Sequence, residues 1–269
     1  MAKSDSWHAP GYDLCVQLIQ RSLAARVIQW VDEIRDVDGY RIVKFKQLQH
    51  AVWWPAALPL HHLWVVADEQ LNPRHWHRYE SHGTEIKPSD VVLDCGASEG
   101  LFALTIAGRC RHVHLVEPSP LYRSALLRTF AEFRNVSIHA VGLGATADRV
   151  AFQDSGVTSG FDERAKTGVE IPIVTADDFF ENQDLKPSFI KADIEGWELA
   201  MLQGAAKLLA GPVRQLAVTV YHTPKNDYRQ ISAFLAGCNP GFRFRFSGVG
   251  DRLDPHGRPV PIVMHVGTE

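Results

Sequence analysis

"VVLDCGASEG", residues 91–100, joins a short apolar run to an acidic residue and then to a turn that contains two glycines. A short apolar run bounded by turn residues is typical of a buried strand. The apolar spacing of "LFALTIAGRC", which follows directly, predicts a helix. In an open α/β sheet, the loop between such a strand and helix lies at the carboxyl edge, where ligands bind. The stretch therefore predicts a ligand-binding loop.

The chemistry of this loop distinguishes between two cofactor classes. A dinucleotide-binding loop follows the pattern G-x-G-x-x-G, and its backbone N–H groups face a pyrophosphate. Here the third glycine of that pattern is missing, and the carboxylates of Asp94 and Glu99 flank the turn. Carboxylates repel a pyrophosphate but attract the sulfonium and ammonium groups of S-adenosylmethionine. The loop therefore favours S-adenosylmethionine, and an NAD-dependent oxidoreductase is the disfavoured alternative.

A further acidic residue ends the next predicted strand. That strand, "HVHLVEP", closes on Glu117 and Pro118. A carboxylate at this place can accept hydrogen bonds from both ribose hydroxyls of an adenosine. The alternative is that the glycines of the first loop only form a tight turn between strand and helix. The predicted cofactor-binding residues are Asp94, Gly96, Ala97, Ser98, Glu99, Gly100, Glu117 and Pro118.

Strand and helix patterns alternate along the chain from residue 90 onwards. Strands are expected in "VVLDCG", "HVHLVEP", "VSIHAVGL", "VEIPIV", "SFIKADIEG", "RQLAVTVYH", "FRFRF" and "PIVMHV". Helix patterns stand between most of these strands, which implies right-handed βαβ units and a parallel sheet. We therefore predict an α/β, Rossmann-like domain over residues 83–269, with helices on both faces of its sheet.

Residues 1–82 are expected to form an N-terminal extension. The apolar spacing predicts a helix over about Asp13–Ile34, and "YRIVKFKQL" alternates as a strand does. The Pro-, Trp- and His-rich stretch Trp53–His82 shows no regular pattern, and Trp76 and Tyr79 are expected either to wall the pocket or to join an aromatic core. Its histidines lack a metal-binding spacing and are expected to be solvated or packed: His61, His62, His75, His77 and His82. We expect a lid, a substrate lobe or a contact within a homodimer.

Composition and charge exclude several classes of function. The 269 residues, 45% of them hydrophobic and 22% charged, suit one large α/β domain with an extra lobe. The net charge of -3 gives no reason to expect a nucleic-acid or membrane partner. No apolar run approaches the roughly 20 residues of a membrane span, and the first residues lack a secretory pattern. The four cysteines are scattered, so a reduced, cytoplasmic location is expected.

Three stretches together resemble the FkbM-type S-adenosylmethionine-dependent methyltransferases: "VVLDCGASEGLFAL", "LVEPSP" and "FIKADIEGWELAMLQGA". The family signature combines an Asp-x-Gly-Ala-x-x-Gly loop with a Lys-x-Asp-x-Glu-Gly-x-Glu block before a Leu-x-Gly-Ala helix. Some members also carry a Tyr-His…Asp segment, matched here by Tyr221, His222 and Asp227, whereas Ser98 departs from the Asn or Cys that is frequent in the family. The resemblance implies a class I methyltransferase fold, with seven strands of which one is antiparallel. It also implies, most often, O-methylation of a natural product, sugar or glycan.

The catalytic candidates lie at the ends of two strands. Asp193 is expected at the carboxyl end of "SFIKADIEG", and His222 ends the strand "RQLAVTVYH". In the class I topology these strands are neighbours about 4.8 Å apart, so both side chains are expected to flank the transferred methyl group. Because imidazole titrates near neutral pH, His222 is predicted to act as general base or to orient the hydroxyl. Asp193 is expected to position the substrate or His222, or to contact the cofactor. Glu195 is the third candidate, and the alternative is an acid at a helix N-terminus that the helix dipole stabilises. Glu198 is expected to be structural or capping.

Asp193, Glu195 and His222 also form a mixed oxygen and nitrogen set that suits Mn, Fe or Zn, although their spacing matches no fixed motif. A divalent metal is therefore an alternative to a metal-free site. The sequence predicts a methyltransferase that acts on a hydroxyl of a small-molecule natural product or of a sugar-containing metabolite. N-methylation of an amine or amide is one alternative, and a non-catalytic cofactor-binding protein is another.

Overall fold

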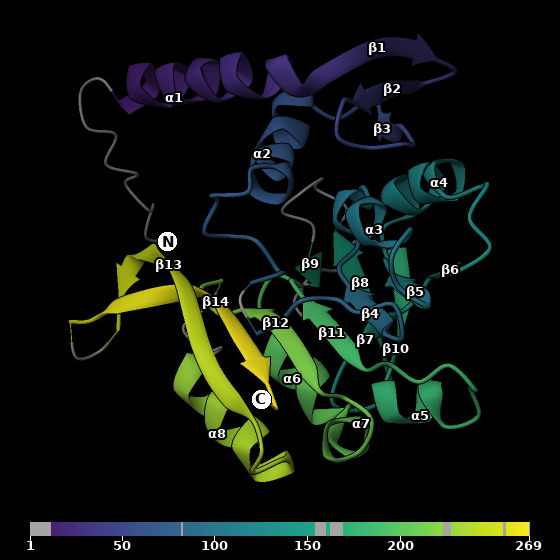
Figure 1. Cartoon of the computed structure of the whole chain (residues 1–269), viewed down its shortest axis with the longest axis vertical. Helices are drawn as coiled ribbons and strands as arrows, with labels where there is room; N and C mark the ends of the chain where they lie inside the picture. The colour runs from purple at the N-terminus through teal and green to yellow at the C-terminus, as the bar shows by residue number, and fades with distance from the viewer. Residues whose placement is uncertain are drawn as a thin grey trace, which may run out of the picture.

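The computed structural model describes residues 12–81, 83–153, 160–161, 169–222, 227–254 and 257–268 (Figure 1). His82, one of the predicted solvated or packed histidines, lies outside these ranges. Within them, no helix has both the length and the apolar character that crossing a membrane requires.

A seven-stranded sheet forms the centre of the fold, in the order β13-β14-β12-β11-β4-β5-β6. Its strands are β4 (Val91–Cys95), β5 (His112–Val116), β6 (Val136–His139), β11 (Phe189–Ala192), β12 (Gln215–Thr219), β13 (Arg243–Leu253) and β14 (Pro259–Gly267). Only β14 runs against the others, because it pairs antiparallel with both β12 and β13. The predicted α/β sheet of seven strands, one of them antiparallel, is confirmed.

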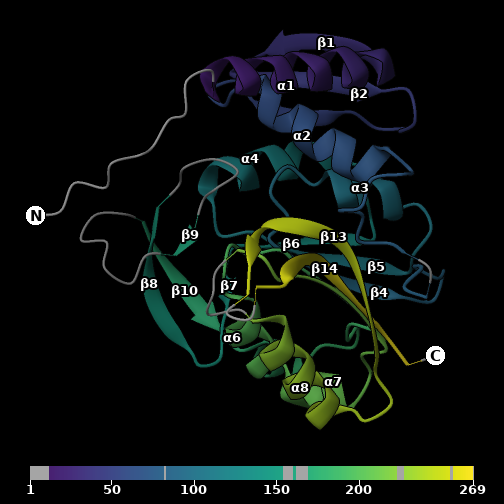
Figure 2. The ribbon, with the colours of Figure 1, turned by 90° about the vertical axis from the view of Figure 1, so that its left-hand side faces the viewer.

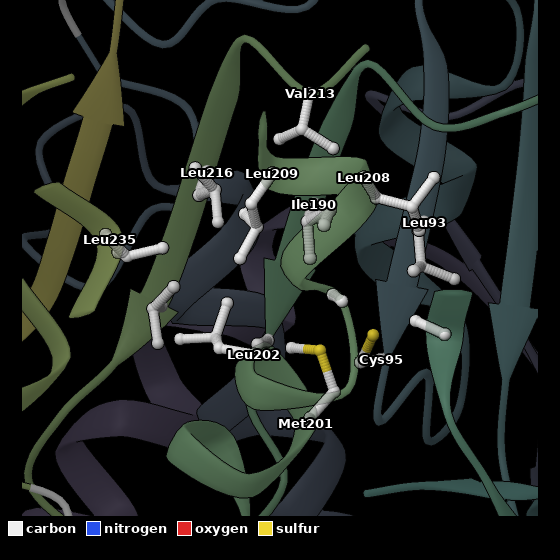
Figure 3. Close-up of a cluster of buried hydrophobic side chains, with 14 of the residues drawn as sticks. Leu93, Cys95, Ile190, Met201, Leu202, Leu208, Leu209, Val213, Leu216 and Leu235 are labelled. Carbon is white, nitrogen blue, oxygen red and sulfur yellow. The ribbon is translucent and has the colours of Figure 1, made fainter. Parts of the chain in front are cut away.

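Helices cover both faces of this sheet (Figures 1 and 2). One face packs against α3 (Leu101–Ile106) and α4 (Pro120–Thr129), and the other against α5 (Ala176–Phe180), α6 (Glu198–Gln203), α7 (Ala206–Ala210) and α8 (Tyr228–Cys238). Figure 3 shows Met201, Leu202 and Leu209 beside Ile190 of β11 and Leu216 of β12. Burying each such side chain stabilises the fold by about 1.5–3 kcal/mol. Coverage on both faces explains why every residue of β4 is buried.

The N-terminal segment is more regular than its sequence predicts. It contains α1 (Tyr12–Val27), the 3-10 helix η1 (Ile28–Trp30), β1 (Val31–Val37), β2 (Tyr40–Phe45), β3 (Val52–Pro55) and α2 (Leu60–Leu71). The strands form a small antiparallel sheet in the order β1-β2-β3. The prediction of no regular structure over Trp53–His82 was therefore wrong for β3 and α2.

The predicted first helix was too long. It ends at Val27, and the rest of the expected range belongs to η1 and β1. Asp38 and Gly39 have φ values of 47° and 80°, and Val37 pairs with Tyr40 across them. This Asp-Gly pair is the turn of a tight hairpin, whose two positive φ values match the twist of the strands. The hairpin draws the residues before it into a strand.

The elements from α1 to α2 pack on α3 and α4 (Figures 1 and 2). Their core includes Trp54, which is fully buried and whose ring centroid lies 6.0 Å from that of Tyr122 in α4. Leu101 of α3 joins the same cluster. The segment therefore shares a core with the main domain. That residues 1–82 form a separate extension stays a prediction.

Trp54→Ala is expected to lower the free energy of unfolding by about 3–5 kcal/mol, because it leaves a cavity in this shared core. Urea denaturation measures the change. Leu127→Ala on α4 is the matched control, since Leu127 is 58% exposed and its loss is expected to change stability by about 0.5 kcal/mol or less. Equal losses in the two variants would contradict the shared core.

A second sheet lies beside the first, in the order β7-β10-β8-β9. It consists of β7 (Gly142–Leu143), β8 (Asp148–Gln153), β9 (Gly160–Phe161) and β10 (Val169–Val174). The predicted strand "VSIHAVGL" is thus divided, because its first half is β6 of the central sheet and its second half is β7. The predicted strand in "VEIPIV" also belongs to the second sheet.

Candidate active site

A cavity of about 290 Å³ lies at the carboxyl edge of the central sheet. The segments that follow β4, β5, β11 and β12 line it, together with β7, α2 and the chain between α2 and β4. Nine of the predicted site residues line the cavity: Gly96, Ala97, Ser98, Glu99, Glu117, Pro118, Asp193, Glu195 and His222. The convergence of parallel strand ends explains why residues far apart in the sequence meet here.

The loop after β4 is held against two neighbouring strand ends. The backbone N–H groups of Gly96 and Ala97 both donate to the carbonyl of Val116, at 3.0 and 3.2 Å. Gly96 has a φ of 76°, and a Cβ atom there would lie 2.1 Å from the carbonyl oxygen of Asp193. Only glycine allows this approach. Ser98 also has a positive φ, of 46°, so the loop presents a strained backbone to the cavity.

Two of the predicted cofactor-binding residues support the loop from behind and do not line the cavity. Asp94 is fully buried, with a carboxylate oxygen 3.1 Å from Nζ of Lys191. Lys191 in turn donates to the carbonyl of Gly96 at 2.6 Å. Gly100 has a φ of 83° and starts α3, where a Cβ atom would lie 2.6 Å from the ring of Phe130. Both residues therefore shape the loop that faces the cavity.

Glu117, which follows β5, lines the cavity and holds the loop after β4. Its Oε2 accepts a hydrogen bond from the backbone N–H of Ser98, and its Oε1 accepts one from that of Ser119, both at 2.8 Å. These bonds fix the carboxylate, which is only 4% exposed. A carboxylate oxygen has a further lone pair, so Glu117 can still accept hydrogen bonds from a ligand diol.

Asp193 and His222 meet as predicted. Nε2 of His222 lies 3.3 Å from Oδ1 of Asp193. Thr219 also donates to Oδ1 of Asp193 at 3.0 Å, and the hydroxyl of Tyr79 donates to Oδ2. The strand β11 stops at Ala192, so Asp193 projects from the loop after the strand.

The expectation that Glu198 is only structural missed its closest contact. Glu198 is fully buried, and its Oε1 lies 2.8 Å from Nδ1 of His222. The same oxygen accepts hydrogen bonds from the backbone N–H groups of Ile194 and Gly196, at 3.1 and 3.2 Å. Glu198 therefore connects the loop after β11 to the histidine. The sequence signal was its place at the start of the helix that directly follows the loop of Asp193 and Glu195.

The carboxylates around His222 control its charge. Burial by itself lowers the pKa of the ring, but the hydrogen bond to Glu198 and the neighbouring charges outweigh burial and raise this pKa to about 9. Burial also works against ionised Asp193, yet His222 and Lys191 keep the pKa of that carboxyl well below its ordinary value. At neutral pH the pair is therefore an imidazolium and a carboxylate.

Glu195 stands at the edge of this cluster. Its φ is 55°, its side chain is 36% exposed, and its Oε1 lies 3.8 Å from Nε2 of His222. Among the described residues, Asp193, Glu198 and His222 each offer an oxygen or nitrogen atom that could bind a metal, and these atoms lie within 4.8 Å of one another. Glu198 therefore takes the place of Glu195 in the predicted set of metal ligands. Metal binding at this cluster stays a prediction.

The N-terminal segment contributes residues that the sequence did not identify. His62 and Glu69 of α2 line the cavity, as do His77 and Tyr79 from the chain that follows. His62 and His77 were expected to be only solvated or packed, whereas Tyr79 lines the pocket, one of the two roles expected for it. Trp76 is not among the lining residues and is 47% exposed. The contacts of Tyr79 with Asp193 and of His77 with Tyr221 span more than a hundred residues, so no short spacing in the sequence indicates them.

Two carboxyl groups of the cavity bind protons more tightly than usual. Burial, helped by the charges of neighbouring carboxylates, raises the pKa of Glu69 to about 8. Burial raises the pKa of Glu99 to about 7, and its Oε2 has no hydrogen-bond partner among the described residues. A cationic ligand would lower both pKa values and favour the ionised carboxylates, so binding of such a ligand is coupled to release of their protons.

Comparisons with known proteins identify the family of the domain. The model of the FkbM methyltransferase domain matches residues 94–244, more than half of the chain. The methyltransferase FkbM from Methylobacillus flagellatus KT has a similar structure, with a TM-score of 0.51 and 20% identity over 93% of this chain and 60% of that one. This chain thus spans 60% of that protein's length.

Two further structures are similar at lower scores. An rRNA methylase from Streptococcus thermophilus has a TM-score of 0.43 and 10% identity, over 68% of this chain and 88% of that one. TYW2 from M. jannaschii, in complex with AdoMet, has a TM-score of 0.45 and 11% identity, over 87% of this chain and 88% of that one. No curated protein sequence matches the chain. On the match of the domain model, the chain belongs to the FkbM methyltransferase family.

Proposed function

We propose that this protein is an S-adenosylmethionine-dependent O-methyltransferase. Its acceptor is a hydroxyl of a small-molecule natural product or of a sugar-containing metabolite. Membership of the family supports methyl transfer. The observation that carries the proposal is the acidic cavity at the carboxyl edge, with Glu117 and the loop after β4 on one side and Asp193 with His222 on the other.

The residues of the cavity fit the cofactor. The fixed carboxylate of Glu117 suits a ribose diol, and the buried, unpartnered oxygen of Glu99 suits a ligand that donates hydrogen bonds or carries positive charge. Gly96, Ala97 and Ser98 bring the backbone close to the ligand, and Pro118 completes the wall.

Bound in this cavity, S-adenosylmethionine supplies a methyl group on a cationic sulfur. The main task of the protein is then to align the acceptor, and such alignment can contribute about 7–11 kcal/mol. The ionised Asp193, held by Tyr79 and Thr219, is a fixed hydrogen-bond acceptor that positions the substrate. Since His222 is protonated at neutral pH, it orients Asp193 and the acceptor rather than removing a proton. Glu195, at the exposed side of the cluster, contacts the remainder of the acceptor.

Calorimetric titration with S-adenosylmethionine, S-adenosylhomocysteine and NADH tests the cofactor, with and without added Mn²⁺. We expect the first two ligands to bind and NADH not to bind. Transfer of a radiolabelled methyl group to a set of hydroxylated and amine-bearing metabolites then tests the acceptor. Label found only on amines would contradict O-methylation, and absence of binding by both sulfur ligands would contradict the cofactor assignment.

A further inference from the structure

Methylation of a hydroxyl releases a proton, and the two residues nearest the predicted reaction centre are poorly suited to take it. Both ring nitrogens of His222 already face carboxylates, since Nδ1 lies 2.8 Å from Oε1 of Glu198 and Nε2 lies 3.3 Å from Oδ1 of Asp193. Both carboxylate oxygens of Asp193 accept hydrogen bonds, from Tyr79 and Thr219. A group in the cavity without such hydrogen bonds is better placed to accept the proton.

His77 has the geometry that this task needs. Its side chain lines the cavity, and the residue is only 2% exposed, so the cavity is its route to a ligand. Neither ring nitrogen has a hydrogen-bond partner among the described residues. The rings of Tyr79 and Tyr221 hold it edge-on, with centroids 5.5 and 6.1 Å from its own. Buried polar groups without a partner are costly, so an imidazole in this position suits a ligand that supplies the missing hydrogen bond.

Glu69 stands behind this imidazole. Its Oε2 lies 3.6 Å from Nδ1 of His77, beyond hydrogen-bond distance but close enough for a small movement to form the bond. A bond from Nδ1–H to the carboxylate would leave Nε2 with a free lone pair. Both residues come from the N-terminal segment, outside the residues matched by the family's domain model.

We propose that His77 is the catalytic residue that accepts the proton of the acceptor hydroxyl, with Glu69 as the residue that positions its ring. This inference rests on the proposed O-methyltransferase function. As the bond between the acceptor oxygen and the methyl carbon forms, the bond between that carbon and sulfur breaks, and the sulfur keeps its electron pair. The hydroxyl proton moves to Nε2 of His77, which becomes an imidazolium and later releases the proton to solvent.

The charges around His77 are consistent with this role. Burial lowers the pKa of the ring to about 4, so its lone pair is available at neutral pH. A weak base suffices, because a hydroxyl oxygen that is gaining a methyl group becomes a strongly acidic oxonium. Neighbouring carboxylates help to raise the pKa of Glu69. A cationic methyl donor in the cavity would offset their charge, lower this pKa and favour the ionised form of Glu69. The charged or titratable groups that face His77 are Glu69, His75, Lys191, Asp193, His222 and His265.

The test uses sinefungin, an S-adenosylmethionine analogue in which a carbon bearing an amino group replaces the methylated sulfur. Its ammonium lies where the methyl group is transferred and can donate a hydrogen bond to a base there. Calorimetry compares sinefungin with S-adenosylhomocysteine. We expect His77→Leu to weaken sinefungin binding about tenfold or more and to change S-adenosylhomocysteine binding by less than about twofold. Leucine removes an unpaired buried polar group, so the variant is expected to fold.

The matched control is His61→Leu, because His61 belongs to α2 but does not line the cavity. It is expected to leave both affinities unchanged. If His77→Leu weakens the two ligands equally, or neither of them, the proposal is overturned. If S-adenosylhomocysteine does not bind the unaltered protein, the proposed function itself fails, which is a distinct result.

A second measurement follows the His77 ring directly in the unaltered protein. Long-range ¹H–¹⁵N spectra of the ¹⁵N-histidine-labelled protein report the protonation of each ring, and the His77→Leu spectrum identifies the His77 signals. With S-adenosylhomocysteine bound, we expect a neutral His77 at neutral pH, and exchange of that ligand for sinefungin should shift the signal of its bare nitrogen. A protonated His77 in the S-adenosylhomocysteine complex would overturn the proposal.

Discussion

Gly96→Ala is expected to weaken the binding of S-adenosylhomocysteine by about a hundredfold or more, because the loop that shapes the cavity cannot accept a side chain. The added methyl group would lie 2.1 Å from the carbonyl oxygen of Asp193, which belongs to the backbone and cannot move aside alone. The φ of 76° adds strain, so stability should also fall by more than about 1 kcal/mol. Relief of the clash would separate the loop after β4 from the loop after β11, and both line the cavity.

The matched control is Gly237→Ala in α8. A Cβ atom at Gly237 meets nothing within 4 Å, and the residue lies inside a helix. Alanine is favoured over glycine there, so stability should rise by about 0.5–1 kcal/mol while binding is unchanged. Calorimetry and urea denaturation give both quantities for each variant. Normal binding by Gly96→Ala would show that the ligand does not use this loop.

The parts of the fold that the sequence predicts correctly are those in which local pattern and burial agree. The run Val91–Leu93 at the start of β4 is apolar, and the fold buries both faces of the strand, so the strand and the loop after it follow from one stretch. The proximity of Asp193 and His222 follows from the pairing of neighbouring parallel strands. These predictions need only the topology of the sheet.

The residues that the sequence misses depend on contacts across long stretches of chain. Glu198 resembles an ordinary helix-start acid, but the positive φ values of Glu195 and Gly196 turn its side chain under His222. His77 lies in a stretch without periodicity, and contacts of that stretch with β13 and with Tyr221, far along the chain, hold it at the cavity. Local propensity carries no information about such contacts.

Glu198→Gln is expected to lower the free energy of unfolding by about 3 kcal/mol at neutral pH, because it removes a buried charge that holds the His222 imidazolium. Glutamine keeps the size of the side chain, so the loss reports the charge rather than a cavity. In the same variant the pKa of His222 should fall from about 9 towards its ordinary value, which NMR titration measures. The surface variant Glu170→Gln is the control, since its exposed ion pair with Arg149 is expected to contribute less than about 1 kcal/mol.

The pH dependence of stability separates this electrostatic role from simple packing. Because the folded protein binds the His222 proton more tightly than the unfolded chain, the stabilisation is fully present below the ordinary histidine pKa of about 6.5 and is lost as the pH rises through about 9. The pKa values of Glu69 and Glu99 are also raised, so these two groups likewise lower the stability of the fold as the pH rises. The informative quantity is therefore the difference in the free energy of unfolding between the unaltered protein and Glu198→Gln. That difference should be largest below pH 6.5 and should shrink towards alkaline pH. A difference that stays constant from pH 6 to pH 10 would mean that Glu198 acts only through its backbone hydrogen bonds, and the charged cluster would then have no part in holding the site together.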